Sequence, residues 1–277
     1  MINKLFFFGT PAFSANILQG LITNNIPISG VITGPDKKQN RGQEIMPSEV
    51  AIVANKNNIT VFKPATIEEL TVILKKEAPD LCLIIAYGMI FPAEIVNNFN
   101  FINIHTSLLP KYRGPSPVQS CLLNGDKITG VTLMKIDTGV DDGDIISAKT
   151  VNIFETETAE SLFKKLETAS IELLTTQLKK HNEWTYSPQA SEVATFTKKI
   201  KKEDGYISLQ TEEHSTIYRK FQAYYLWPGI YTFQDEQRIK ITDLKFTNNK
   251  LEIISVQKEG KRPIPYKDFL NSNKPLI

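Results

Sequence analysis

Short apolar runs alternate with stretches of helical periodicity through the first half of the chain, and this alternation limits the folds that it can adopt. The apolar runs predict buried strands at residues 5–8, 28–32, 81–85, 101–104 and 131–135. The stretches between these runs have apolar residues at helical spacing and predict helices at residues 13–21, 49–54, 67–74 and 117–123. Such alternation predicts an α/β fold, a mostly parallel sheet with helices on both faces. Ligands of such sheets bind beyond the carboxyl ends of the strands.

The first predicted helix begins with residues typical of a helix start. Thr10 suits the N-cap, and Pro11 suits the first turn, where no backbone N–H is needed. Gly9, just before them, allows a close approach of the backbone. Neither a Gly-x-Gly-x-x-Gly motif nor a P-loop is present, so we expect neither a dinucleotide nor ATP.

The second half of the chain predicts a long helix followed by a smaller β unit. Apolar residues recur at helical spacing from about residue 159 to 180. A polar stretch at 181–197, which includes Pro188, then indicates a linker. Beyond it the pattern predicts a helix at 212–225 and strands at 230–233, 239–246 and 251–256. We predict a first domain at 1–186, a linker at 187–204 and a small, shortened, oligonucleotide-binding-like β domain at 205–277.

Two polar residues end the fourth apolar run. Asn103 and His105 are two positions apart, so in a strand their side chains point to the same face. Pro110 and Gly114 then break regular structure. Asparagine is a neutral donor for a developing oxyanion, and histidine can donate a hydrogen bond or move a proton. For His105 alone, an ordinary histidine at a strand end is an equally good interpretation.

An acidic cluster follows the fifth apolar run, at Asp137, Asp141, Asp142 and Asp144. Glycines lie among these carboxylates, and aspartate and glycine are common in turns for steric reasons alone. An aspartate beside a histidine can also fix the imidazole and accept a proton. Together the three residue types suit acyl transfer.

The arrangement resembles the 10-formyltetrahydrofolate-dependent formyltransferase family. In that family an Asn-x-His pair precedes Ser-Leu-Leu-Pro-x-aromatic-Arg-Gly, which matches residues 103–114 here. A catalytic aspartate follows in a Gly-x-Asp-x-Gly loop. The matching residue is Asp141, and 141 − 105 = 36 positions separate it from His105, as the family pattern requires. The resemblance implies that Asn103, His105 and Asp141 are the catalytic residues.

Further motifs are similar to those of the methionyl-tRNA formyltransferase family, over nearly the whole chain. They lie at residues 7–13, 33–36, 41–42, 46–48, 86–88, 219–221 and 226–229. The chain departs from the family where Ala12 replaces an acidic residue, Pro115 and Ser116 replace two alanines, and Asp142 replaces threonine. After Trp227 it is shorter than the family's C-terminal domain.

The resemblance implies formyl transfer from 10-formyltetrahydrofolate to the amino group of initiator methionyl-tRNA, in translation initiation. It implies a folate site formed by Tyr87, Gly88, Ser107, Leu108, Leu109, Pro110 and Asp137. For three of these a structural role is also open: Tyr87 in the core, Ser107 in its loop and Asp137 in a turn. Basic residues in the 33–48 loop are expected to bind tRNA, namely Lys37, Lys38 and Arg41. Phe13 is expected in the methionine pocket, with a core position as the alternative.

Three other functions fit parts of the pattern. A nucleotide-sugar N-formyltransferase would use the same folate donor and catalytic residues. The shortened C-terminal unit favours this reading, whereas the basic loop opposes it. A formyltetrahydrofolate hydrolase would use the same three residues, but no extra N-terminal regulatory domain is visible. A catalytically idle RNA-binding homologue is disfavoured by the intact Asn103, His105 and Asp141.

Composition adds expectations about partners and location. The net charge of +2 over 277 residues does not by itself indicate nucleic-acid binding. Cys82 and Cys121 lie among apolar residues without nearby metal-ligand partners, so we expect buried thiols in a reducing compartment and no metal site. No apolar segment approaches the length of a membrane span. We therefore expect a cytoplasmic monomer with no membrane partner.

Overall fold

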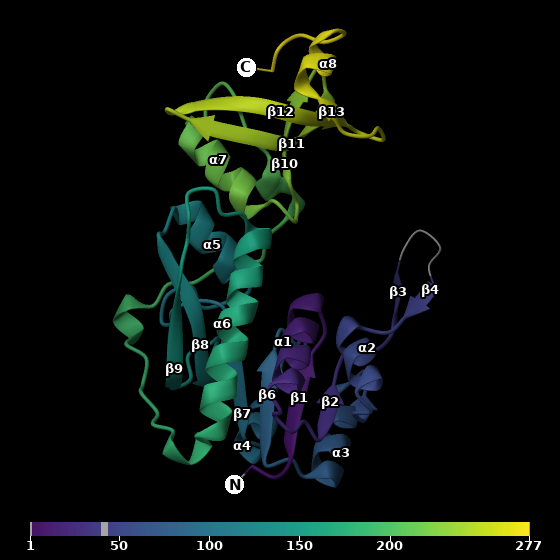
Figure 1. Cartoon of the computed structure of the whole chain (residues 1–277), viewed down its shortest axis with the longest axis vertical. Coiled ribbons are helices and arrows are strands. Elements are labelled where there is room, and N and C mark those ends of the chain that lie inside the picture. The colour runs from purple at the N-terminus through teal and green to yellow at the C-terminus, as the bar shows by residue number, and fades with distance from the viewer. Residues whose placement is uncertain (1, 40–43, 277) are drawn as a thin grey trace. The chain divides into compact units, whose positions relative to one another are not determined.

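The computed structural model describes residues 2–39 and 44–276. These residues form two compact units (Figure 1). The first unit lies within Met1–Arg113, Thr129–Val151 and Lys165–Phe196. The second unit lies within Gly114–Ile128, Asn152–Lys164 and Thr197–Ile277.

A seven-stranded sheet forms the centre of the first unit, in the order β5-β2-β1-β6-β7-β8-β9. The strands are β1 (Leu5–Gly9), β2 (Gly30–Ile32), β5 (Val61–Phe62), β6 (Leu81–Ile85), β7 (Phe101–His105), β8 (Ile128–Lys135) and β9 (Ile145–Asn152). The pairs from β5 to β7 are parallel, and β8 is antiparallel to β7. The predicted α/β fold with a mostly parallel sheet is confirmed.

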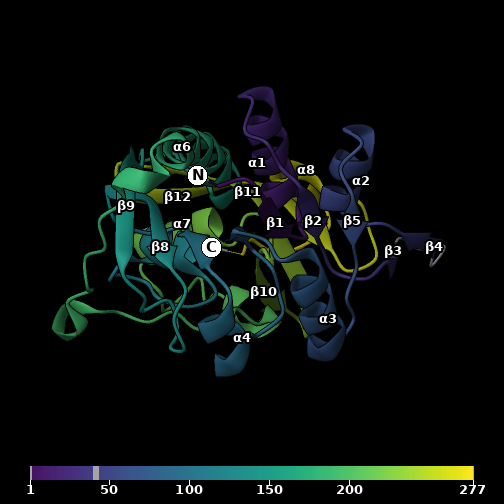
Figure 2. The ribbon, with the colours of Figure 1, turned by 90° about the horizontal axis from the view of Figure 1, so that it is seen from below.

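Helices cover both faces of this sheet, as predicted. They are α1 (Ala12–Thr23), α2 (Glu49–Lys56), α3 (Ile67–Glu77), α4 (Ala93–Asn98) and α6 (Ala159–Lys179). Figure 2 shows α1, α2 and α6 on one side of the sheet and α3 and α4 on the other. Right-handed crossovers explain this, because the chain moves outward from β1 to β5 and then returns to β6. On the α3–α4 side the fully buried rings of Phe6, Phe8 and Phe101 pack with residues of both helices.

The start of α1 differs from the prediction. Pro11 holds the N-cap position without a side-chain hydrogen bond, and the helix begins at Ala12. The Thr10 hydroxyl oxygen accepts a long hydrogen bond from the Gly34 backbone N–H, at 3.3 Å. Thr10 therefore links β1 to the segment after β2 instead of capping α1. The close approach expected at Gly9 is confirmed, because an added Cβ would lie 2.6 Å from the Ser14 Cβ.

A hairpin stands where the sequence predicted a loop between β2 and α2. Its strands are β3 (Lys37–Gln39) and β4 (Glu44–Met46), which pair antiparallel with Lys37 opposite Met46. At the hairpin's base the Thr33 and Ser48 hydroxyls lie 2.7 Å apart, and Ser48 caps α2. Arg41, predicted to bind tRNA, lies outside the described residues.

The second unit contains the predicted small β domain. Its antiparallel sheet has the order β10 (Ile230–Gln234), β11 (Gln237–Thr247), β12 (Lys250–Lys258) and β13 (Ile264–Pro265). Its helices are α5 (Pro117–Asn124), α7 (His214–Ala223) and α8 (Tyr266–Leu270). Helix α7 packs against α5, β11 and β12, and α8 packs against β12 and β13. A short 3-10 turn of this unit lies at Lys202–Gly205, whereas those at His181–Glu183 and Ser191–Val193 belong to the first unit.

No helix in the described part of the chain combines the length and the apolar character that a membrane crossing requires.

Candidate active site

Strand β7 presents two of the predicted site residues on one face. Asn103 and His105 lie at its carboxyl-terminal end, between β6 and β8. The Asn103 side chain is half-buried, and within residues 2–39 and 44–276 its carboxamide has no hydrogen-bond partner. A partly exposed amide with its N–H groups uncommitted can donate to a reacting oxygen.

The His105 ring is held from both of its nitrogens. It is only 6% exposed. Nε2 lies 2.8 Å from the Tyr112 carbonyl oxygen, which can only accept, so this nitrogen donates. Nδ1 lies 3.5 Å from Oδ2 of Asp141, a distance beyond an ordinary hydrogen bond but within ion-pair range. The expected proximity of His105 and Asp141 is present.

Asp141 reaches His105 by a route that the sequence analysis did not foresee. If the strand before the acidic loop were parallel to β7, the loop would follow directly at the sheet edge where His105 lies. Because β8 runs antiparallel to β7, its last residue, Lys135, is opposite Ile102, at the start of β7. His105 is opposite Thr132 instead. The loop between β8 and β9 therefore folds back along the sheet to bring Asp141 to His105.

Local backbone geometry shapes this loop, residues 136–144, which we call the return loop. Asp141 has φ of +47°, the left-handed region that aspartate and asparagine tolerate better than most residues. Gly143 is buried, and a Cβ there would overlap the Lys135 carbonyl oxygen. The Lys135 N–H donates to the Asp144 carbonyl at 2.9 Å, which closes the base of the loop.

Gln189 also contacts the return loop, although it lies in the predicted linker. Its Nε2 donates to the carbonyl oxygens of Asp141, at 2.9 Å, and Gly143, at 2.7 Å. Its Oε1 accepts from Nε of the buried Arg113 at 3.0 Å. Sequence reasoning missed Gln189, and the only signal was a glutamine beside Pro188 in an otherwise unremarkable polar stretch.

The loop after β7 contains four of the predicted folate-site residues. The buried Ser107 hydroxyl donates to the Lys111 carbonyl at 2.6 Å, which favours a structural role. Thr132 of β8 ties the loop down by donating to the Ser107 carbonyl and accepting from the Leu109 N–H. Leu108 lies against Gly130, where an added Cβ would meet its side chain at 2.6 Å. Pro110 follows Leu109 in the same turn, half-buried.

The remaining folate candidates lie after β6 and β8. The Tyr87 ring packs edge-on against Phe8, with centroids 5.6 Å apart, and beside Phe91. Its hydroxyl is buried without a partner in the described part of the chain, and burial raises the pKa of Tyr87 to about 12. Gly88 is exposed. Asp137 is exposed and accepts from the Thr138 N–H at 2.6 Å, which is turn geometry.

The residues predicted to contact the formyl acceptor lie far in sequence from Asn103, His105 and Asp141. Lys37 is exposed on β3, and the backbone of Lys38 is in the same strand. Phe13 is half-buried in the first turn of α1, so it is neither a fully buried core residue nor a surface one.

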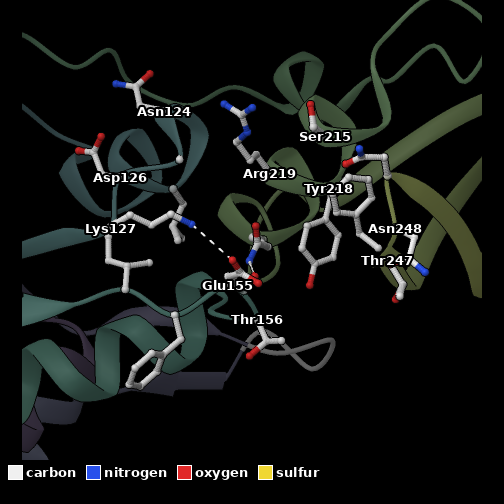
Figure 3. A pocket seen from close by; sticks show the side chains of 17 residues that line it. Asn124, Asp126, Lys127, Glu155, Thr156, Ser215, Tyr218, Arg219, Thr247 and Asn248 are labelled. Atoms are coloured by element: carbon white, nitrogen blue, oxygen red, sulfur yellow. Dashed lines mark hydrogen bonds and ion pairs between the residues drawn. The ribbon is translucent and has the colours of Figure 1, made fainter.

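Described residues of the second unit line hollows of different character, of which we consider a smaller and a larger one. One, of about 290 Å³, is lined by Trp227, by one carboxylate, Glu259, and by four cations, Lys202, Arg238, Lys240 and Lys258. The other, of about 780 Å³, has mixed charge, and Figure 3 shows Lys127 and Glu155 pointing toward one another in its wall. None of the residues predicted from the sequence to form the site lines either hollow.

Both cysteines are buried free thiols, as expected. Burial raises the pKa of the Cys82 thiol well above its usual range. Within the described ranges no three His, Cys, Asp or Glu side chains come together as a metal site.

Comparisons with known proteins show similarity along most of the chain. Residues 3–178 match the formyl transferase family, and residues 199–252 match the formyl transferase C-terminal domain. The methionyl-tRNA formyltransferase of Campylobacter curvus is 35% identical, over 98% of this chain and 97% of that protein. That of a Sulfurihydrogenibium species is 39% identical, over 93% of this chain and 86% of that protein.

Two solved structures share the fold. The methionyl-tRNA formyltransferase of Clostridium thermocellum aligns with a TM-score of 0.63 at 19% identity, covering 92% of this chain and 98% of that one. An N-formyltransferase of Helicobacter canadensis, solved with folinic acid and dTDP-3-aminofucose, aligns with a TM-score of 0.69 at 21% identity, covering 96% and 99%.

Proposed function

Because this chain belongs to the formyl transferase family, we propose that it transfers a formyl group from 10-formyltetrahydrofolate to the amino group of initiator methionyl-tRNA. The observation that carries the proposal is the cluster at the end of β7. There the uncommitted Asn103 amide shares a strand face with His105, and His105 faces Asp141. The relatives that are 33–39% identical over most of the chain are named methionyl-tRNA formyltransferases.

The proposed roles follow from which side-chain atoms already have a hydrogen-bond partner in the protein. The new bond joins the acceptor nitrogen to the formyl carbon, the bond from that carbon to the folate nitrogen breaks, and one proton passes from the acceptor amine to the folate nitrogen. Asn103 donates to the formyl oxygen as it becomes an oxyanion. His105 and Asp141 accept and relay the proton, with the Tyr112 carbonyl fixing the orientation of the ring.

The folate site is proposed beside this cluster, on the loop that Thr132 ties to β8. Leu108, Leu109 and Pro110 offer an apolar edge there, with Tyr87 and Gly88 at the end of the neighbouring strand β6. The buried, unpartnered Tyr87 hydroxyl supports a polar contact at this position, because an unmade hydrogen bond in the interior costs about 1–3 kcal/mol. Ser107 and Asp137 serve the site through the backbone that their side chains hold.

The basic hollow of the second unit supports an RNA acceptor. Lys202, Arg238, Lys240 and Lys258 gather around the half-exposed Trp227. Arg238 stacks on Tyr231 at 3.7 Å, and Lys258 is held by Asn273. Lys240 has no hydrogen-bond or ion-pair partner among the described residues. An uncommitted lysine beside other cations suits phosphate, because neutralising phosphates releases counterions.

The proposed acceptor is tested by supplying 10-formyltetrahydrofolate with either methionyl-tRNA or a dTDP-4-amino sugar. We expect formylation of methionyl-tRNA. Formylation of the sugar alone would move nucleotide-sugar N-formyl transfer to first place.

Replacing Lys240 with alanine should weaken kcat/KM for methionyl-tRNA several-fold. It should also flatten the dependence of log(kcat/KM) on log[salt] by about one unit of slope, because one phosphate contact is lost. Lys149→Ala is the matched control, since Lys149 is an exposed lysine held by Glu172 at 2.8 Å. Equal salt slopes for the two variants would remove Lys240 from the RNA site.

Arg41→Ala independently tests the tRNA contact predicted from the sequence for residues 33–48. We expect a loss of methionyl-tRNA formylation with little change in KM for the folate donor. An unchanged kcat/KM at low and high salt would remove the predicted contact of Arg41 from the acceptor site.

We also propose a cytoplasmic monomer with its catalytic domain at 1–186, a linker at 187–204 and a C-terminal domain at 205–277, and Phe13 in the methionine pocket. The two buried thiols support a reducing compartment. Light scattering of the purified chain tests the oligomeric state.

A further inference from the structure

The segment 187–196 contacts the Asp141 side of the candidate pair through Gln189. The Gln189 amide uses both N–H groups, one on the Asp141 carbonyl and one on the Gly143 carbonyl. Its oxygen accepts from Arg113, whose side chain is 5% exposed. A half-buried glutamine thus anchors the return loop directly at Asp141, on either side of Asp142.

The same segment contacts the His105 side through Thr195. The Thr195 hydroxyl oxygen accepts from the Tyr112 N–H at 2.8 Å, and its carbonyl accepts from the Arg113 N–H at 2.8 Å. Tyr112 has a φ of +62°, and its carbonyl in turn accepts from His105 Nε2. One short segment therefore fixes the backbone groups that hold both His105 and Asp141.

We propose that Gln189 is a positioning residue that sets the separation of His105 and Asp141, an inference that rests on the proposed function of this pair. Asp141 lies in the middle of a nine-residue connection between β8 and β9 and in the left-handed region, and Gln189 holds its backbone carbonyl from outside this loop. A misplacement of about 1 Å at a reacting group can cost about 100-fold in rate.

The amide group is the part of Gln189 that the geometry requires. Two carbonyl oxygens face its nitrogen, and a carboxylate in that place would repel both while offering no donor. Methionine has a similar length and shape but makes none of the three hydrogen bonds. Asparagine keeps the amide on a side chain that is one methylene shorter.

The second unit supplies a matched control. Gln222 is buried, and its Nε2 donates to two carbonyl oxygens of one loop, those of Glu155 at 2.8 Å and Glu157 at 2.7 Å. Gln222→Met removes two amide-to-carbonyl hydrogen bonds, like the two that Gln189 makes to the return loop, at a place without a proposed catalytic role. A purely structural effect of losing such a pair is therefore measured in the same protein.

The experiment measures kcat, KM and Tm for the wild type, Gln189→Met and Gln222→Met with methionyl-tRNA. We expect a comparable fall in Tm for both variants. Only Gln189→Met should lose kcat, by roughly 10- to 100-fold, with KM for the folate donor within about 2-fold. Gln189→Asn should recover part of that kcat, and it replaces Gln189→Met if that variant does not fold. Equal kcat in all folded variants would overturn the proposal.

A second readout does not depend on the activity. Nitrogen-15 labelling of the three histidines gives imidazole signals that His105→Gln assigns. Gln189→Met should shift the His105 signals, whereas Gln222→Met should leave them in place. A wild type that formylates neither acceptor refutes the proposed function. Unchanged His105 signals in Gln189→Met refute the positioning role alone.

Discussion

The Asn103→Ala enzyme is expected to turn over about 100- to 1,000-fold more slowly than the wild type, the usual loss when one oxyanion donor is removed. The Asn103 amide has no partner in the described part of the chain, so its removal leaves no protein group unsatisfied. The fall should therefore appear in kcat with little change in Tm or in the KM for either substrate.

Single-turnover formylation with saturating donor and acceptor measures this step directly. Asn100→Ala is the matched control: Asn100 lies just before β7, at the opposite end of the strand, and donates to the Asp80 carbonyl at 3.2 Å. Near-normal turnover of Asn103→Ala would exclude Asn103 as an oxyanion donor. An equal loss of turnover in Asn100→Ala would mean that the substitutions act by disturbing strand β7 and not by removing an oxyanion donor.

Asp141→Asn should lower kcat by about 100-fold or more, because a group that accepts a proton is replaced by an amide that does not. Asparagine suits this position otherwise, since it tolerates the left-handed φ of +47°. Gln189 bonds the backbone carbonyl of Asp141, so that contact survives the substitution. The expected loss therefore isolates the carboxylate.

The neighbouring Asp142→Asn serves as the control, because Asp142 is exposed in the same loop and has the same charge. Measured with methionyl-tRNA, it should keep at least half of the wild-type kcat. Equal losses in the two variants would assign the effect to the net charge of the loop, and full activity of Asp141→Asn would leave His105 without its proposed partner.

The central sheet could be predicted because its strands are buried on both faces. Runs such as Leu5 to Phe8 are uniformly apolar, and apolar residues recur at helical spacing in the stretches between them. The elements that were missed lack such signals. Strand β9 is at the sheet edge with no fully buried residue, β5 has two residues, and α4 has six. The β3–β4 hairpin carries lysines and glutamine in short strands, so its sequence resembles a loop.

The candidate site was predicted in part. Alternate residues of a strand point to the same face, and this alone predicted that Asn103 and His105 share a face. Nothing in the local pattern singled out Asp141 among four aspartates, and only the spacing of the family motif did so. Gln189 and Thr195 act through hydrogen bonds to residues 48 and 83 positions away, and such contacts have no periodicity to read. Thr10 shows the same limit, since its partner Gly34 displaced the expected cap.

Because β8 pairs antiparallel with β7, the distance between Asp141 and His105 depends on the register of these two strands. Sliding β8 by two residues would keep every side chain on its face, so the alternation of the two faces alone would not distinguish the slipped sheet. It would carry the base of the return loop about 7 Å along the sheet, however, and so separate Asp141 from His105. We expect a chain with this shifted register to be compact but inactive. Activity per molecule is therefore a more sensitive test of correct β7–β8 pairing than a measurement of molecular size.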